Sequence, residues 1–412
     1  MPDCPASQVP DCLASHAMVS IHVPICNEAP ERVCRLLAAL AALDYPAFEV
    51  LVVDHNTADP KLWEPAARDC ARHDARFRFF HLGPLPSGRA GALNFARAQA
   101  NDQAEVVAVL DADVVVLRHW LRDAASGFAD PRVGVVWAPC LVRKSALDSV
   151  GGWAEWAITE DAALDFAISQ GGWLAAAPAV AADHGPADFA TMRLQAARRA
   201  YGAAQIVRRC WKPLFSPFAR ELTRRQRWHV VAGWLPWTGD ALALMLLLVT
   251  LILTVGLSLV PWRSGAPIIL CTLPSLGLLA YRMARARTAG ARAVITELAL
   301  SHTVARAFWN GLLGRNAPSL HQADPRQEPS WADGLPREEL ALLLLTWAAL
   351  AGIATTHGLA TWQAILWCAA LLMQSVPYLA AASFTARAAL RTWRPPASRP
   401  SLQPVARTGT GD

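Results

Sequence analysis

Two carboxylates separated by one residue, Asp111 and Asp113, follow directly after the apolar run Val106–Leu110. An apolar run of this length is typical of a buried strand in a parallel sheet, and ligands bind at the carboxyl ends of such strands. Two carboxylates there could share a divalent cation that neutralises a diphosphate leaving group. A strand-end turn that uses Asp for its backbone tolerance explains the pair equally well.

A second polar group, Asp54-His55-Asn56-Thr57, follows the apolar run 48–53. A carboxylate at this position could accept a hydrogen bond from the N–H of a nucleotide base. An ordinary turn is again an equally good explanation of the same residues.

A third group, Thr159-Glu160-Asp161, precedes a helix that we expect over 162–169. The structural interpretation makes Thr159 the N-cap, with the acidic residues favoured by the helix dipole. The functional interpretation makes Asp161 a general base, which removes a proton from an acceptor hydroxyl as that hydroxyl attacks an anomeric carbon. Taken alone, the group favours the structural interpretation.

Basic residues lie just before the long apolar runs of the chain, within Gln195–Gly202. Arg198 and Arg199 could bind a diphosphate, although a positive flank of a membrane span is the favoured explanation when the segment is taken alone. The sequence shows no Ser/His/Asp or Cys/His triad, no P-loop and no zinc pattern.

The elements that must position these residues alternate between strand and helix. Short apolar runs predict strands, and apolar residues at helical spacing predict helices. The alternation predicts an α/β fold with a Rossmann-like, mostly parallel sheet that is covered on both faces. The expected strands are 18–24, 48–53, 77–81 and 106–110, and the expected helices are 31–42, 60–73 and 88–101.

The second half of the chain has the composition of a membrane domain. Hydrophobic residues make up 54% of the chain and the mean hydropathy is +0.24. Residues 294–313 contain charges and predict an amphipathic helix on the cytoplasmic membrane surface. Four runs are long and apolar enough to predict an α-helical transmembrane domain: 241–260, 266–281, 340–356 and 361–382.

Charge and cysteine content support a cytoplasmic location for the first domain. The net charge is +5, and the Arg-rich flanks of the apolar runs predict both termini in the cytoplasm and no nucleic-acid partner. The nine Cys form no C-x-x-C pair, and the first residues lack an apolar signal region. We therefore expect reduced thiols and four segments: a disordered tail (1–17), the α/β domain (18–228), the transmembrane domain (229–386) and a second disordered tail (387–412).

Taken in order, these pieces resemble the membrane glycosyltransferases of family 2, the group that contains cellulose synthase. The later strings look most like bacterial β-glucan synthases. The likeness runs from about Val19 to Arg315 and rests on Val19-Ser-Ile-His-Val-Pro24 with Asn27-Glu28, Leu43-Asp-Tyr-Pro46, Ala90-Gly-Ala-Leu-Asn94, Val109-Leu-Asp-Ala-Asp113, Gly151-Gly-Trp153, Ile158-Thr-Glu-Asp161, Ala232-Gly-Trp-Leu-Pro-Trp237 and Leu300-Ser-His-Thr303.

The resemblance implies a GT-A fold, a nucleotide-diphosphate-sugar donor, a Mg²⁺ or Mn²⁺ cofactor and inversion at the anomeric carbon. It assigns the base to Asp161, donor binding to Asp54, Arg89, Asp111 and Asp113, the metal to Asp113 and Asp111, and acceptor or diphosphate binding to Glu160, Gln195, Arg198 and Arg199.

The chain also departs from the family pattern. The stretch from Asp113 to Thr159 is shorter than usual, and Arg199 stands where the Q-x-x-R-W motif has Trp. Arg89 replaces the usual Lys, and the gating element expected near Ala317–His321 is not intact.

The favoured hypothesis is an inverting transferase that moves a sugar, expected to be glucose, from a UDP-sugar to a β-glycan acceptor at the cytoplasmic face of the inner membrane. The expected partners are the UDP-sugar, a glycan or lipid acceptor, membrane lipids and further subunits of a synthase complex. Two alternatives stay open: a catalytically inactive paralogue that serves as a membrane subunit, and a non-processive transferase with a lipid acceptor.

Overall fold

The computed structural model describes residues 17–137, 139–176, 189–215, 224–259, 266–315, 337–357 and 361–392. The chain forms two compact units, Met1–Leu246 with Ser301–Glu328, and Leu247–Leu300 with Pro329–Asp412. The segment Ala317–His321 and nearly all of the two expected tails lie outside the described residues.

The first unit contains a seven-stranded sheet in the order β3-β2-β1-β4-β6-β5-β7. The pairs β1–β2, β1–β4, β2–β3 and β5–β7 are parallel, whereas β4–β6 and β5–β6 are antiparallel. The prediction of a mostly parallel sheet is therefore confirmed. The strands are β1 (Val19–Ile25), β2 (Phe48–Asp54), β3 (Phe77–His81), β4 (Val106–Val109), β5 (Val133–Val136), β6 (Cys140–Arg143) and β7 (Leu174–Ala176).

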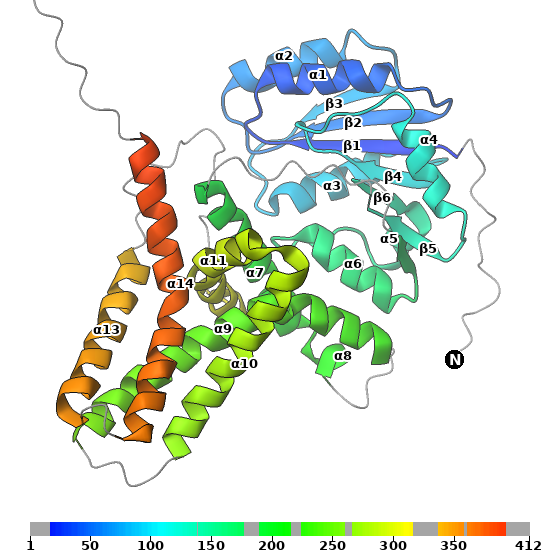
Figure 1. Ribbon diagram of the computed structural model, residues 1–412. Coiled ribbons are helices and arrows are strands. Elements are labelled where there is room, and N and C mark those ends of the chain that lie inside the picture. Colours follow the sequence, from blue (N-terminus) through cyan, green and yellow to red (C-terminus); the bar gives the residue numbers. More distant parts are fainter. Residues whose placement is uncertain are drawn as a thin grey trace, which may run out of the picture. The chain divides into compact units, whose positions relative to one another are not determined.

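Helices cover both faces of this sheet, as the sequence predicts. Figure 1 shows α1 and α2 on one face and α3 on the other. Prolines at the first helical positions, Pro30 and Pro60, suit helix starts because their missing N–H has no partner there. The helices of this unit around the sheet are α1 (Pro30–Ala41), α2 (Pro60–Cys70), α3 (Gly88–Gln99), α4 (Trp120–Ala125), α5 (Lys144–Ser149), α6 (Glu160–Gln170), α7 (Phe189–Arg209) and α8 (Trp211–Phe215).

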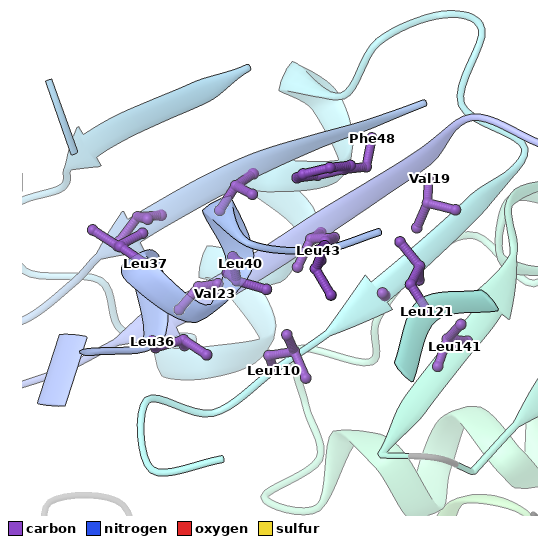
Figure 2. Close-up of a cluster of buried hydrophobic side chains, with 14 of the residues drawn as sticks. Val19, Val23, Leu36, Leu37, Leu40, Leu43, Phe48, Leu110, Leu121 and Leu141 are labelled. Carbon is purple, nitrogen blue, oxygen red and sulfur yellow. The ribbon is translucent and has the colours of Figure 1, made fainter. Parts of the chain in front are cut away.

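The main core lies between the sheet and the α1–α2 face. Every residue of β1 is buried, which agrees with a central strand covered on both sides. Figure 2 shows this cluster, in which Leu40 of α1 lies near Val23 of β1, and Leu37 and Phe48 are further members. This packing fixes the strands whose carboxyl ends carry the candidate site.

The second half of the chain is helical. Four helices are long and apolar enough to cross a membrane, over Trp237–Gly256, Ala266–Thr288, Arg337–Thr356 and Trp362–Arg387, which agrees with the four expected spans. The surface position expected for 294–313, now part of α11, stays a prediction. The helices are α9 (Arg224–Leu259), α10 (Ala266–Ala289), α11 (Ala291–Leu313), α13 (Arg337–His357) and α14 (Trp362–Thr392), and α14 thus runs past the expected boundary at 386.

Polar side chains join the apolar helices of the second unit. Trp367 Nε1 donates to Thr254 Oγ1 at 2.9 Å. Gln374 Nε2 donates to Thr250 Oγ1 at 3.1 Å and to Ser275 Oγ at 2.9 Å. Hydrogen bonds between helices are a usual way to hold membrane helices together, because lipid offers these groups no partner.

Candidate active site at the carboxyl edge of the sheet

Arg89 links the end of β4 to the start of α6. It is the second residue of α3, after Gly88, which takes a φ of 54° that favours glycine. Its Nη2 donates to Asp111 Oδ1 at 2.7 Å, and its Nη1 pairs with Glu160 Oε1. Burial lowers the pKa of Arg89, but the charges of Asp111 and Glu160 outweigh this effect and raise it. The guanidinium is therefore a permanent positive charge at this edge.

Asp161 follows Glu160 at the start of α6. It is exposed, and its Oδ1 accepts from the backbone N of Ala162 at 2.8 Å. Cys140 lies within electrostatic range of the side chains of Arg89, Asp111, Glu160 and Asp161. Burial raises the pKa of the Cys140 thiol; Arg89 opposes this, and Asp161, Glu160 and Asp111 add to it. The thiol therefore stays protonated and serves as a neutral neighbour of the charges.

Asp113 faces a different set of residues from Asp111. It lines a pocket of about 140 Å³ together with Arg32 and Arg35 of α1 and Val114. Asp113 and Asp111 are both exposed, and carboxylate oxygens are the ligands that Mg²⁺ and Mn²⁺ prefer. Among the described residues, no group of three or more His, Cys, Asp or Glu side chains is arranged to hold a metal ion. The oxygen donors that this edge offers a cation are thus the two exposed carboxylates.

Asp54 at the end of β2 is already fully engaged. Its side chain is 1% exposed, Oδ1 accepts from Thr57 Oγ1 at 2.6 Å, and Oδ2 accepts from His81 Nδ1 at 2.6 Å. Burial raises the pKa of Asp54, while the hydrogen bonds from Thr57 and His81 oppose the rise. His81 in turn stacks on Trp63, with ring centroids 4.2 Å apart and an interplanar angle of 17°.

Side-chain hydrogen bonds tie the neighbouring strand ends together. The Asn27 backbone N donates to Thr57 Oγ1 at 2.8 Å, which connects the ends of β1 and β2. Asn56 exchanges two hydrogen bonds with the backbone of Leu85, at 2.6 and 3.1 Å, and so holds the loop that leads to Arg89. Asn27 and Asn56 have φ angles of 52° and 56°, which Asn tolerates better than most residues.

His55 precedes Asn56 in the chain and lies close enough to Arg89 for the two to interact electrostatically. The ring is buried, and burial together with the smaller effect of the positive charge of Arg89 lowers its pKa to about 4. His55 is therefore neutral at physiological pH and adds no charge to the cluster.

The segment before Asp161 is held by α7. Thr159 takes the expected N-cap position, but its hydroxyl makes no capping hydrogen bond and has no partner among the described residues, because the side chain is turned against Gly202 of α7. Gln205 of α7 fixes the preceding residues, since its Oε1 accepts from Ile158 N at 3.0 Å and its Nε2 donates to Trp156 O at 3.3 Å. The acidic first turn expected for this helix is present.

The expected site residues fall into four places. Arg89 pairs with Asp111 and Glu160, and Asp161 follows Glu160 in α6. Asp113 lines the pocket beside α1, and Asp54 lies at the end of β2, which β1 separates from β4. The fourth place is α7, where Gln195, Arg198 and Arg199 are exposed, and no hydrogen bond or ion pair within the described residues engages these side chains. The roles expected for these residues stay predictions.

Sequence reasoning missed several residues of this site: Trp63, His81, Cys140 and Gln205. His81 ends β3 in the way that Asp54 ends β2, so the rule that ligands bind at strand ends could have found it. Cys140 and Gln205 left no such signal, because their positions depend on the antiparallel strand β6 and on the packing of α7.

Comparison with known proteins identifies relatives of this domain. The sequence profile described as Glycosyl transferase family 2 matches residues 20–152. A beta-monoglucosyldiacylglycerol synthase of Synechocystis sp. is 29% identical over 180 residues, which are 32% of this chain and 36% of that protein. The protein of the same name from Trichormus variabilis is 27% identical over 201 residues, which are 38% of this chain and 42% of that protein. The chain thus matches less than half the length of these curated relatives.

Two solved structures show a more distant likeness. The mannosyltransferase PcManGT from Pyrobaculum calidifontis, in complex with GDP-Man and Mn²⁺, has a TM-score of 0.48 and 19% identity over 72% of this chain and 88% of that chain. The TarS protein of S. aureus has a TM-score of 0.34 and 20% identity over 49% of this chain and 44% of that chain.

Proposed function

We propose that the chain, whose residues 20–152 match the Glycosyl transferase family 2 profile, transfers a sugar from a nucleotide-sugar donor to a lipid acceptor at a membrane. The proposed donor is UDP-glucose and the proposed product is a β-linked glycolipid. The name of the curated relatives, beta-monoglucosyldiacylglycerol synthase, supports a diacylglycerol-like acceptor over the β-glycan acceptor that the family resemblance favours.

The observation that carries this proposal is the position of Arg89 between Asp111 and Glu160, with Asp161 beside them. A departing nucleoside diphosphate needs positive charge, and a guanidinium supplies it with several hydrogen-bond donors. In the proposed step, the acceptor oxygen bonds to the anomeric carbon while the bond from that carbon to the diphosphate breaks. The acceptor proton passes to Asp161, and the electron pair leaves with the diphosphate.

A divalent cation, Mg²⁺ or Mn²⁺, is part of the proposal. Asp111 and Asp113 would hold it, since both carboxylates are exposed; Asp111 also accepts a hydrogen bond from Arg89 through Oδ1. When bound, such a cation supplies charge that stabilises the diphosphate as it leaves. Asp111 remains 59% exposed while it is paired with Arg89, so the pair leaves room for a ligand.

A lipid acceptor is consistent with the second half of the chain, where four helices are long and apolar enough to cross a membrane. We propose that the transferase domain lies on the cytoplasmic side, where nucleotide sugars are available. Gln195, Arg198 and Arg199, exposed on α7, are the proposed contacts of the diphosphate or of the acceptor headgroup.

The test uses the full chain in detergent with radiolabelled UDP-glucose, Mg²⁺ or Mn²⁺, and dioleoylglycerol. A labelled lipid that carries one sugar supports the proposal. A long glycan product would instead support the β-glycan acceptor. An absence of any transfer with UDP-, GDP- and other nucleotide sugars overturns the proposed activity.

The role of Asp161 is tested with a matched pair of variants. Asp161→Asn removes the proposed base and should lower kcat by about 10²–10⁴-fold while donor binding is retained. Asp102→Asn is the control, because Asp102 is an exposed carboxylate in the turn before the opposite end of β4. Equal activity of the two variants would remove Asp161 from the mechanism.

A second candidate, a catalytically inactive membrane subunit, is supported by two departures from the family pattern: Arg199 in the Trp position and the short stretch from Asp113 to Thr159. Under this candidate, deletion of the chain changes the glycolipids or glycans of the host, whereas Asp161→Asn does not. A strong effect of the point variant rules the subunit out.

A further inference from the structure

We propose that His81, held by Asp54 and stacked on Trp63, selects the nucleobase of the donor and favours a base that carries a ring N–H. The inference rests on the proposed function, since it assumes that a nucleotide binds at this edge of the sheet. It assigns base recognition to a residue outside the sequence strings that define the resemblance.

Asp54 cannot read a base directly in this arrangement. Its side chain is 1% exposed, and each of its oxygens already accepts a short hydrogen bond, one from Thr57 and one from His81. Each oxygen keeps a second lone pair, but the side chain is so deeply buried that a base could reach it only by displacing Thr57 or His81. We therefore assign recognition of the base to His81, the more exposed of the two residues, whose side chain is 33% exposed.

The contact with Asp54 decides what His81 offers a ligand. An ionised carboxylate only accepts hydrogen bonds, so in the proposal, where the ring carries one proton, that proton lies on Nδ1, 2.6 Å from Asp54 Oδ2. The other ring nitrogen, Nε2, then carries a lone pair and accepts a hydrogen bond. Asp54 acts on the base through His81 by fixing this tautomer, as outer carboxylates do for histidine ligands of metals.

The position of His81 suits a base at the sheet edge. His81 is the register partner of Asp54 in the parallel pair β2–β3, so both residues lie at the carboxyl ends of their strands. Trp63 covers one face of the imidazole at 4.2 Å and restricts its rotation. The ring is thus fixed by a hydrogen bond on its edge and a stacking contact on its face.

An acceptor at Nε2 discriminates between bases. Uracil and guanine carry a ring N–H that can donate to it, whereas cytosine and adenine present a lone pair at the equivalent nitrogen. Two facing acceptors repel and leave both groups without a partner, so a site of this kind rejects the wrong base. The expected order of affinity is UDP and GDP above CDP and ADP.

The test measures binding of UDP, GDP, CDP and ADP to the full chain in detergent by calorimetry, for the wild type and three variants. His81→Asn keeps a donor toward Asp54 and removes the atom at Nε2; His81→Gln keeps a polar atom near Nε2. The matched control is His73→Asn, because His73 also contacts an aromatic ring (Phe77, 4.7 Å) and a carboxylate (Asp69, 3.9 Å), but precedes the opposite end of β3.

We expect His81→Asn to reduce the preference for UDP over CDP by about fivefold to tenfold. His81→Gln should retain part of this preference, and His73→Asn all of it. A wild type that prefers UDP, together with an unchanged preference in His81→Asn, overturns the inference and leaves the proposed function standing. A wild type that prefers CDP or ADP also overturns it. If the wild type binds no nucleoside diphosphate, the proposed function fails first and the inference fails with it.

Discussion

Nη2 of Arg89 lies 2.7 Å from Oδ1 of Asp111, although the two residues are 22 positions apart and belong to different elements. The same guanidinium pairs with Glu160, whose side chain is only 7% exposed. A carboxylate buried to this extent depends on its partner, because the protein interior solvates an isolated charge poorly. Arg89 is therefore a structural link between α3, β4 and α6 as well as a candidate donor-binding residue.

Removal of this link should destabilise the domain. We predict that Arg89→Ala lowers the free energy of unfolding by about 2–4 kcal/mol, since Glu160 loses its partner. Denaturant unfolding in detergent, followed by tryptophan fluorescence, measures the change. Arg97→Ala is the control on the same helix: Arg97 pairs with Asp148 at a more exposed site, with side chains 28% and 39% exposed, and its removal should cost at most about 1 kcal/mol. Equal losses in the two variants would contradict the prediction.

The contact between Gly202 and Thr159 predicts a measurable coupling. A Cβ on residue 202 would lie 2.0 Å from Thr159 Oγ1, so Gly202→Ala should cost about 1–3 kcal/mol and shift the start of α6. Thr159→Ala removes a hydroxyl that has no hydrogen-bond partner and should cost less than about 1 kcal/mol.

A double-mutant cycle tests this pair. The combination of Gly202→Ala with Thr159→Ala should recover at least about 1 kcal/mol of the loss, because the second change removes the atoms that clash. Strictly additive effects would show that the clash is relieved elsewhere.

Gln205 should act as a positioning residue for Asp161. Gln205→Ala removes both hydrogen bonds to the segment 156–158. Because the base Asp161 is then misplaced, kcat should fall by about tenfold while the donor Kd stays within about twofold. Gln205→Glu keeps the acceptor for Ile158 N and should be intermediate. Gln99→Ala, at an exposed position of α3, is the control. A parallel loss of donor affinity would point to general unfolding instead.

Two buried histidines predict a loss of stability in acid. Burial lowers the pKa of His22 to about 3 and that of His55 to about 4, against about 6.5 for a free ring. Below pH 6.5 the unfolded chain binds protons that the folded chain does not, so the stability from these rings is complete above pH 6.5 and is lost as the pH falls towards 4 and 3.

Replacement of His22 alone isolates the contribution of this ring to the pH dependence of stability. Between pH 6 and 4, the unfolding free energy of His22→Leu should fall less steeply than that of the wild type, by up to about 1.4 kcal/mol per pH unit. His119→Asn, which changes an exposed ring, should leave the slope unaltered. A wild-type slope in His22→Leu would mean that His22 is not neutral and buried in solution.

The metal proposal predicts a specific dependence on Asp113. In donor-binding titrations, Asp113→Asn should raise the half-saturating Mn²⁺ concentration by about tenfold or more, because one charged ligand is lost. Chelation with EDTA should weaken donor binding to the wild type, and Asp102→Asn should behave as the wild type does. Donor binding that is insensitive to EDTA would argue against a metal at this site.

The first four strands and the three helices between them could be predicted from the sequence, because long apolar runs alternate there with helical spacing. Strands β5, β6 and β7 were missed, since they contain only three or four residues. Arg143 at the end of β6 made this strand harder to predict, because a charged residue suggests an exposed position. In the structure Arg143 is 2% exposed and donates to the backbone of Val133 and Phe128.

For the site, the rule about strand ends drew attention to Asp54 and Asp111, and the strings around Asp161 drew attention to the start of α6. The partners of these residues could not be predicted. The bond from His81 to Asp54 depends on the register of β3 against β2, and the packing of Thr159 depends on a helix 40 or so residues further along the chain.

The tie between Asn56 and Leu85 extends the sheet beyond its last strand residue. Leu82 N donates to Asp54 O at 2.8 Å, and the Asn56 side chain then exchanges two bonds with Leu85, much as one more residue of β2 would. These hydrogen bonds fix the conformation of the loop before Arg89 without a ligand. A ligand that binds here meets an edge that is already ordered, so less of its interaction energy is spent on the entropy of arranging the chain.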